Sequence, residues 1–192
     1  KLASDKLFIN ANSMVGNKKC KFSILRYGNV FGSRGSVAPY FKKLEKEKKD
    51  LTVTDLNMTR FSITLDEGVN FALMSLKMMM GGELFVPKSP SYKLKDLIRA
   101  FGKNKIKIIG MRAGEKIHED LISKSDSFYT YDLGKLYLIA PNIEVVKWKI
   151  SLFKKYNKNL KIKKCSEDFS YSSDKNKFFL KVSQLKYLID KI

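Results

Sequence analysis

Three short segments of this 192-residue sequence carry the residue types that bind phosphate groups. The first is a glycine-rich loop over residues 28–36, which follows a β-rich run; glycines at the carboxyl end of a strand let a backbone approach a ligand. The second places Arg60 at the start of a strand, and the third places Arg112 and Glu115 on either side of Gly114. Two guanidinium forks in one small domain suit a diphosphate, because each can make paired charge-assisted hydrogen bonds. A surface salt bridge explains each arginine equally well on its own.

These segments lie between helices and strands that alternate along the chain, which favours the α/β class. The helix at 66–79 is expected to bury Val69, Phe71, Ala72, Leu73, Leu76 and Met79. The other predicted helices are 2–12, 37–48, 93–101, 115–123 and 183–190. The predicted strands are 20–27, 51–54, 61–64, 83–86, 105–110, 128–131 and 136–139.

The charge is strongly basic, with 38 Lys and Arg against 19 Asp and Glu, a net +19 and a pI near 9.8. Thirty-three of the basic residues are Lys and five are Arg, whereas readers of nucleic-acid sequence depend on the arginine fork. The excess is spread along the chain and indicates a solvated lysine-rich surface. A lysine-rich nucleic-acid-binding module stays open as an alternative, and a steep salt dependence would favour it. In a chain that otherwise uses Lys, an Arg marks a place where a planar fork matters.

Several other classes of protein are excluded by composition. Hydrophobic residues make up 44% of the chain, which excludes a disordered tail. Two cysteines, Cys20 and Cys165, are too few for a disulfide scaffold, and one histidine, His118, cannot make a His-rich metal site. No apolar run approaches the roughly 18 residues of a membrane span. Cys20 is expected in the core, and His118 is expected on a helix face in a structural role.

The ordered motifs KLASDKLF, RYGNVFGSRGSVAPYF, MTRFSITLDEGV, GGELFVPKSPS and IIGMRAGEKIHEDLI closely resemble the carboxyl-terminal half of the extended short-chain dehydrogenase/reductases. Within that superfamily they are most similar to the inverting UDP-N-acetylglucosamine 4,6-dehydratases of flagellin and surface-polysaccharide modification. The resemblance implies the end of a dinucleotide-binding domain over residues 1–36. Residues 37–192 would be mainly a substrate-binding domain, with some segments returning to the Rossmann sheet.

The resemblance also implies roles for individual residues. Lys1 falls where the catalytic Tyr-x-x-x-Lys signature has its Lys, so it is the expected catalytic and cofactor-binding residue. The Tyr, the glycine fingerprint and the Asp–Lys pair of the elimination would then lie upstream, and the chain is expected to be an inactive fragment. Tyr27 and Val30 match positions at the nicotinamide end of NADP. The expected UDP-sugar contacts are Asn29, Arg34, Val37, Arg60, Arg112 and Glu115, with both of the last two arginines on the diphosphate.

By the same resemblance the reaction is loss of water from UDP-N-acetylglucosamine with NADP recycled internally. A UDP-sugar 4-epimerase, or another nucleotide-sugar dehydratase of the superfamily, shares the fold and the diphosphate clamp and remains an alternative. The expected setting is a cytoplasmic homo-oligomer that binds neither nucleic acid nor a membrane.

Overall fold

The computed structural model describes residues 2–16, 18–102, 105–141 and 148–192. The chain forms two compact units, each assembled from three separate segments. Unit 1 comprises residues 1–27, 69–88 and 121–170, and unit 2 comprises residues 28–68, 89–120 and 171–192. Helix α3 (Leu65–Met78) and strand β8 (Asp120–Ile122) each begin in unit 2 and end in unit 1. The division of function between residues 1–36 and 37–192 stays a prediction.

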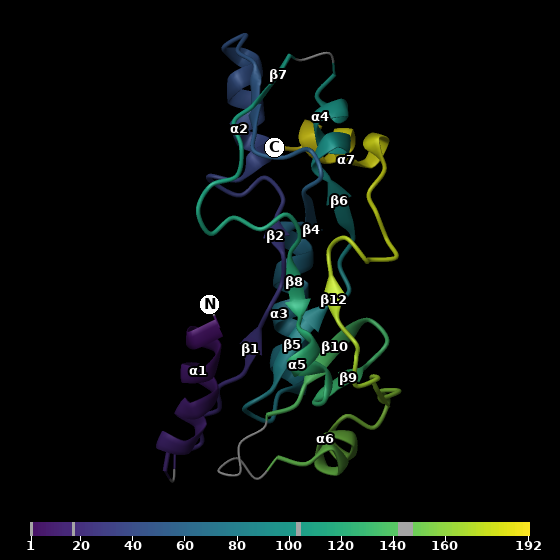
Figure 1. The fold of residues 1–192 in the computed structure, drawn as a ribbon. Helices are drawn as coiled ribbons and strands as arrows, with labels where there is room; N and C mark the ends of the chain where they lie inside the picture. Colours follow the sequence, from purple (N-terminus) through teal and green to yellow (C-terminus); the bar gives the residue numbers. More distant parts are fainter. Residues whose placement is uncertain (1, 17, 103–104, 142–147) are drawn as a thin grey trace. The chain divides into compact units, whose positions relative to one another are not determined.

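Unit 1 is built on a mixed sheet of strand order β1-β5-β10-β9-β11, in which β1 and β5 run parallel and the other pairs antiparallel (Figure 1). Phe71, Phe85, Leu138 and Phe153 are buried at its core. Its elements are α1 (Leu2–Met14), β1 (Ile24–Leu25), β5 (Leu84–Pro87), α5 (Lys124–Ser127), β9 (Thr130–Asp132), β10 (Leu136–Ile139), α6 (Ile150–Tyr156) and β11 (Lys163–Lys164).

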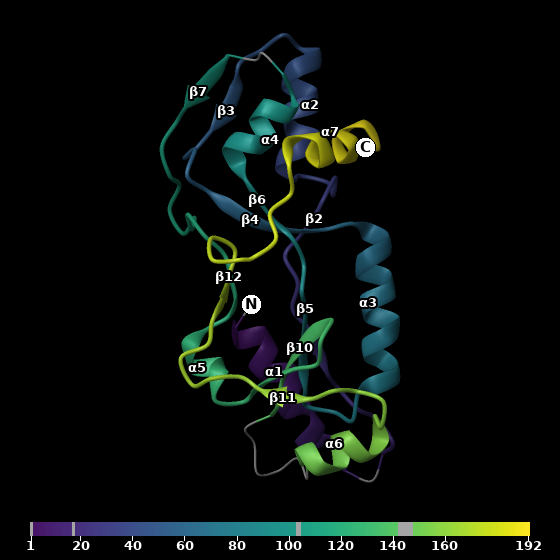
Figure 2. The ribbon, with the colours of Figure 1, turned by 90° about the vertical axis from the view of Figure 1, so that its right-hand side faces the viewer.

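Unit 2 contains a three-stranded sheet of order β2-β4-β6 and a parallel pair, β3-β7. Helices α4 and α7 lie side by side in both ribbon views (Figures 1 and 2) and share a core with α2 and β3. The elements are β2 (Asn29–Val30), α2 (Val37–Lys46), β3 (Leu51–Val53), β4 (Thr59–Ile63), β6 (Ser91–Lys93), α4 (Leu94–Ala100), β7 (Ile106–Ile108), β12 (Tyr171–Ser172) and α7 (Val182–Asp190).

The α/β class and most of the predicted elements are confirmed. The helix expected at 115–123 is wrong, because residues 113–119 form turns and bends and β8 follows them. Helix α3 forms as expected, but Val69, Leu73 and Leu76 are exposed, since only the side of the helix that carries Phe71 and Ser75 is buried.

The prediction that Cys20 lies in the core is also wrong. Cys20 lies in an irregular, exposed segment before β1, not in the core.

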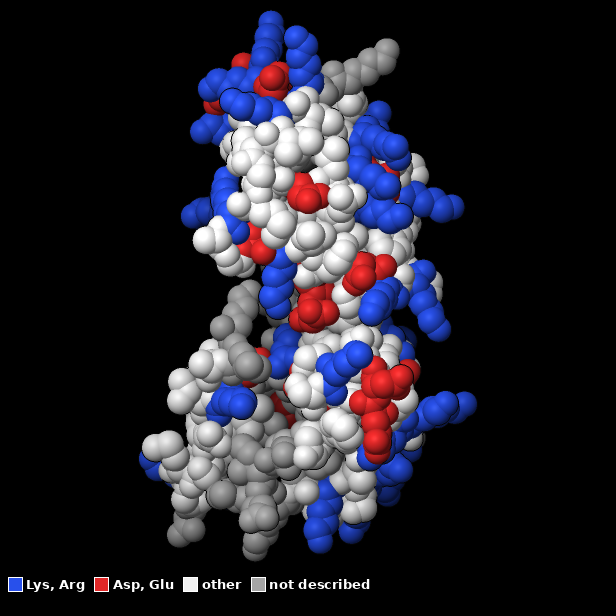
Figure 3. All heavy atoms as spheres, viewed as in Figure 1, with Lys and Arg blue, Asp and Glu red and all other residues white. Residues whose placement is uncertain are grey.

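Basic side chains are spread over the face shown in Figure 3, with acidic side chains among them. None of the described helices is both long and apolar enough to cross a bilayer.

Unit 1 encloses a carboxylate that is wholly buried, that of Glu83. Its oxygens accept hydrogen bonds from the backbone N–H groups of Met80 (2.6 Å) and Gly81 (2.8 Å). Two side chains complete the set: the Ser23 hydroxyl at 2.6 Å and the Trp148 indole N–H at 2.9 Å. A buried carboxylate is tolerated only with such a set of donors. Glu83 therefore joins the segment before β1, the end of α3 and the segment before α6.

We expect Glu83→Gln to destabilise unit 1. Each carboxylate oxygen of Glu83 accepts from two donors, and in glutamine one of these oxygens becomes an NH₂ group, which is itself a donor. A lost hydrogen bond to a charged group corresponds to about 2 kcal/mol of unfolding free energy. Urea denaturation followed by Trp148 fluorescence measures the loss. Glu45→Gln, at an exposed position on α2, is the control; equal urea midpoints for the two variants would contradict the role assigned to Glu83.

Candidate functional site

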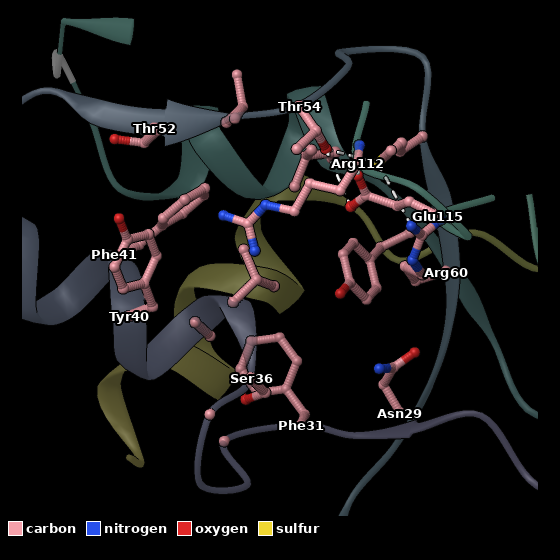
Figure 4. A pocket seen from close by; sticks show the side chains of 18 of the residues that line it. Asn29, Phe31, Ser36, Tyr40, Phe41, Thr52, Thr54, Arg60, Arg112 and Glu115 are labelled. Atoms are coloured by element: carbon pink, nitrogen blue, oxygen red, sulfur yellow. Dashed lines mark hydrogen bonds between the residues drawn. The ribbon is translucent and has the colours of Figure 1, made fainter. Parts of the chain in front are cut away.

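One cavity in unit 2, of about 480 Å³, brings together most of the predicted binding residues. Its walls come from β2, the start of α2, β3, β4, β6 and the loop after β7. Six predicted residues line it: Asn29, Val30, Val37, Arg60, Arg112 and Glu115. Figure 4 shows polar side chains of this set around an interior that aromatic rings partly fill. The cavity is large enough for a small-molecule ligand.

The backbone of the segment that leads into β2 approaches strand β4 closely, next to residues that line the cavity. Gly28 precedes β2, which runs parallel to β4. A Cβ on Gly28 would lie 2.3 Å from Phe61 Cβ and 3.0 Å from the Phe61 carbonyl oxygen. No other residue fits at that separation, so the first glycine of the glycine-rich loop serves packing and places Asn29 at the cavity.

The Arg60 guanidinium is bound by protein groups on all of its nitrogens. Nη1 donates to the carbonyl oxygens of Thr59 at 2.8 Å and Ile117 at 2.9 Å. Nη2 donates to the carbonyl oxygen of Lys116 at 2.9 Å. Nε lies 3.6 Å from a carboxylate oxygen of Glu119. Arg60 on β4 therefore fixes the path of residues 116–119, the segment that follows Arg112 and Glu115.

Asn29 joins the same polar cluster through Glu119. With its amide nitrogen turned toward the carboxylate, Asn29 donates to the two oxygens of Glu119 at 3.0 and 3.1 Å. Glu119 thus lies between Asn29 of β2 and Arg60 of β4, two neighbouring strands. This carboxylate is held by a cation and an amide, and it orients both.

A tight turn presents Arg112 and Glu115. The Glu115 N–H donates to the Arg112 carbonyl oxygen at 3.0 Å, and Gly114 takes a φ of 78°, which favours glycine. The Glu115 carboxylate accepts from the Arg112 N–H at 3.1 Å and from the Thr54 hydroxyl at 3.2 Å. In this arrangement Glu115 closes the turn onto β3. The UDP-sugar contact expected for Glu115 stays a prediction.

The Arg112 guanidinium differs from that of Arg60 in having no partner in the part of the chain that the structure describes. Among the described residues, no carboxylate or carbonyl takes a hydrogen bond from its side chain. Figure 4 shows the side chain reaching into the cavity toward Phe41 and away from Glu115. An unpaired arginine facing a partly apolar cavity favours an anionic ligand.

His118 lies in a hydrogen-bond chain, although not on the helix expected for it. Its Nδ1 is 2.8 Å from the Thr59 hydroxyl, which is 2.7 Å from the hydroxyl of Ser173. Ser173 Oγ also accepts from the Glu119 N–H at 2.9 Å. The chain ties residues 118–119 to β4 and to the segment after β12. This is the structural role predicted for the histidine.

The remaining predicted residues are not brought to the cavity. Lys1 lies outside the described residues. Tyr27 belongs to unit 1, where its half-exposed ring meets the edge of Phe71 at a centroid distance of 6.4 Å. Arg34 is exposed on the glycine loop and does not line the cavity. The roles assigned to Lys1, Tyr27 and Arg34 stay predictions.

Sequence reasoning missed four residues of this region: Ser36, Thr54, Tyr92 and Glu119. Glu119 follows the RAGEK segment and could have been suspected as the counter-ion of an arginine. Tyr92 lies in a β-rich run with no motif around it, so no sequence signal marks it.

The solved structures support the class of the fold. The chain is similar over its full length to Pen from Bacillus thuringiensis, with a TM-score of 0.80 and 30% identity, and it covers 56% of that chain. The mixed sheet and the motifs are those of an α/β protein of the short-chain dehydrogenase/reductase type. Residues 1–141 match the family described as polysaccharide biosynthesis protein. The chain belongs to that family.

Curated relatives agree with this assignment. A protein of Campylobacter jejuni subsp. jejuni serotype O:2, named UDP-N-acetylglucosamine 4,6-dehydratase (inverting), is 49% identical over 99% of this chain. A protein of the same name from serotype O:23/36 is 51% identical over 92% of it. A Rickettsia bellii UDP-glucose 4-epimerase is 40% identical over 72%. The chain spans 57%, 53% and 42% of these proteins, respectively.

Substitution of the two cavity arginines is expected to affect stability differently. Arg60→Met keeps the length of the side chain but removes its donors from the 116–119 segment, so we expect the unfolding free energy to fall by about 2 kcal/mol. Arg112→Met removes a guanidinium without a described partner and should leave stability unchanged. Urea unfolding of both variants measures the difference, and similar losses in the two would refute this account of Arg60.

Proposed function

We propose that this chain contributes the nucleotide-sugar-binding part of an NADP-dependent UDP-N-acetylglucosamine 4,6-dehydratase (inverting), a lyase of nucleotide-sugar biosynthesis. The observation that carries the proposal is the cavity of unit 2. It collects five of the six residues that match the family's substrate positions, together with Val30 from the predicted cofactor end, and Arg112 offers it a guanidinium without a described partner. The names of the two Campylobacter relatives supply the substrate and the reaction.

The share of the reaction assigned to this chain is binding and orientation. Arg112 is proposed to hold the diphosphate of the UDP-sugar with a guanidinium that has no described partner. Arg60 is proposed to reach the diphosphate by exchanging a protein acceptor for a phosphate oxygen, since protein groups occupy all of its nitrogens. Before the ligand binds, Arg60 gives its donors to carbonyl oxygens and holds the Arg112 loop in place. Asn29, fixed by Glu119, is proposed to contact the sugar at the edge of β2. Positioning of this kind lowers the entropic part of the barrier for the reacting end of the substrate.

NADP would supply the acceptor and donor of hydride. The residues described here do not by themselves form a site for it: the sequence has no GxGxxG fingerprint, and Tyr27 and Val30 are the matched positions that the structure describes. No step through the cofactor is therefore assigned to this chain. The proposal includes a cytoplasmic homo-oligomer that binds no nucleic acid and no membrane.

A UDP-sugar 4-epimerase is the second candidate, favoured by the Rickettsia relative. The two candidates share the nucleotide but differ in product. If this chain is joined to the upstream part of a Campylobacter relative, a 4-keto sugar formed from UDP-N-acetylglucosamine supports the dehydratase. An epimerised, fully hydroxylated sugar supports the alternative.

We expect Arg112→Lys and Arg60→Lys each to weaken the binding of UDP to the 192-residue chain. A lysine cannot reproduce two fork hydrogen bonds to phosphate, and Arg60→Lys also loosens the loop that carries Arg112. The loss is roughly 1.5–3 kcal/mol, or roughly ten- to a hundredfold in affinity. Isothermal titration calorimetry measures it. Arg99→Lys is the control, since Arg99 is largely exposed and pairs with Asp96 on α4; equal affinity in all three variants would mean that the substrate site lies elsewhere.

We also expect the 192-residue chain alone to show no measurable binding of NADPH, because it lacks the glycine fingerprint that cradles the pyrophosphate. A titration followed by NADPH fluorescence is the measurement, and UDP serves as the positive control for a folded chain. Saturable binding at micromolar NADPH would contradict this part of the proposal.

A further inference from the structure

Helix α2 begins at the cavity with an unusual amino-terminal end. Ser36 is its N-cap residue, yet the serine hydroxyl makes no capping hydrogen bond. A serine in this position ordinarily accepts from the N–H group of the second or third helical residue. Here the third helical residue is Pro39, which has no N–H to give. The Ser36 hydroxyl does not accept from the Ala38 N–H either, so the first turn leaves the N–H groups of Val37 and Ala38 without a capping side chain.

The Ser36 hydroxyl is itself buried and without a partner among the described residues. Ser36 lines the cavity and is seen at its edge in Figure 4. Native proteins rarely leave a buried hydroxyl unsatisfied, and such an exception calls for an explanation. A ligand group at the start of α2 provides one.

A second hydroxyl of the cavity wall is that of Tyr92 on β6. Tyr92 is 3% exposed, lines the cavity and packs its ring edge-on against Phe31 at a centroid distance of 6.4 Å. Among the described residues, its hydroxyl has no hydrogen-bond partner. Tyr92 lies directly opposite Arg60 in the β4–β6 pairing. Burial raises the pKa of the Tyr92 phenol above its usual value, so the hydroxyl keeps its proton and remains a donor.

The groups around the two hydroxyls favour negative charge. The amino-terminal end of a ten-residue helix carries a partial positive charge and free N–H groups. The Arg112 guanidinium points into the same cavity without a partner. The only carboxylate among the described residues that line it is Glu115, which accepts from the Arg112 N–H and from Thr54.

We propose that Ser36 and Tyr92 each donate a hydrogen bond to the diphosphate of the bound nucleotide sugar, with the N–H groups at the start of α2 as further donors. The inference rests on the proposed function, since it names two more binding residues of the same cavity. The diphosphate would take over the capping of α2 that the Ser36 side chain does not provide.

The test compares Ser36→Ala and Tyr92→Phe with wild type in the 192-residue chain, by calorimetric titration of UDP and of uridine. Each variant should lose on the order of tenfold in affinity for UDP, the scale of one hydrogen bond to a charged group, and none for uridine. Neither variant should lower the thermal midpoint of the free protein, because neither hydroxyl has a partner to lose. A structural role would give the reverse: lower stability and unchanged affinity.

Two matched controls remove a hydroxyl elsewhere. Ser75→Ala deletes the other buried serine hydroxyl without a described partner, on α3 of unit 1, and Tyr171→Phe deletes a phenol that donates to the Ser89 carbonyl oxygen at 2.9 Å. Both should bind UDP as wild type does, and Tyr171→Phe should be less stable. Wild-type UDP affinity in Ser36→Ala and Tyr92→Phe would overturn this inference alone. An equal loss for uridine would also overturn it, and failure of the wild-type chain to bind UDP would overturn the proposed function together with it.

Discussion

The guanidinium of Arg60 is the constraint on which the cavity depends. Backbone carbonyl groups in an irregular segment need donors that the segment does not provide, and the 116–119 segment has neither helix nor strand. One planar fork on β4 meets the carbonyl oxygens of Lys116 and Ile117 and approaches the Glu119 carboxylate. The loop that carries Arg112 is thereby fixed against a rigid strand. A lysine, with one nitrogen, could not span these acceptors.

Around that fixed loop the polar groups of the cavity divide into two kinds. Arg60, Asn29 and Glu115 are satisfied by protein groups, which hold them in place before any ligand arrives. Arg112, Ser36 and Tyr92 have no such partners among the described residues. The residues of the first kind keep the cavity wall in its geometry, and those of the second kind can form new hydrogen bonds with a ligand. Preorganisation of this sort reduces the cost of ordering side chains on binding.

The class of fold could be predicted from the local alternation of helical and strand patterns, and six residues of the cavity from the resemblance of their motifs to a known family. Helix α2 forms within the range predicted for it, 37–48, and the rarity of arginine pointed to Arg60 and Arg112. The helix expected at 115–123 failed for a long-range reason, since Arg60 binds carbonyl oxygens that a helix would have used internally. The burial predicted for Val69, Leu73 and Leu76 of α3 is also wrong, because helical periodicity does not tell which apolar face other elements cover. The binding role proposed for Ser36 and Tyr92 could not be predicted, because it follows from the absence of hydrogen-bond partners among the described residues, which only the structure shows.

The order in which the chain builds its two units has a consequence for how the protein can vary. The backbone passes between the units after residues 27, 68, 88, 120 and 170, so no single cut separates them. Recombination at one point cannot exchange either unit for that of another protein, and neither can be expressed as one continuous stretch. Most changes in the length of a connecting segment must be absorbed near these crossings or in surface loops. The two units are therefore expected to be inherited together, and new ligand preferences to arise by substitution within the cavity wall rather than by shuffling of domains.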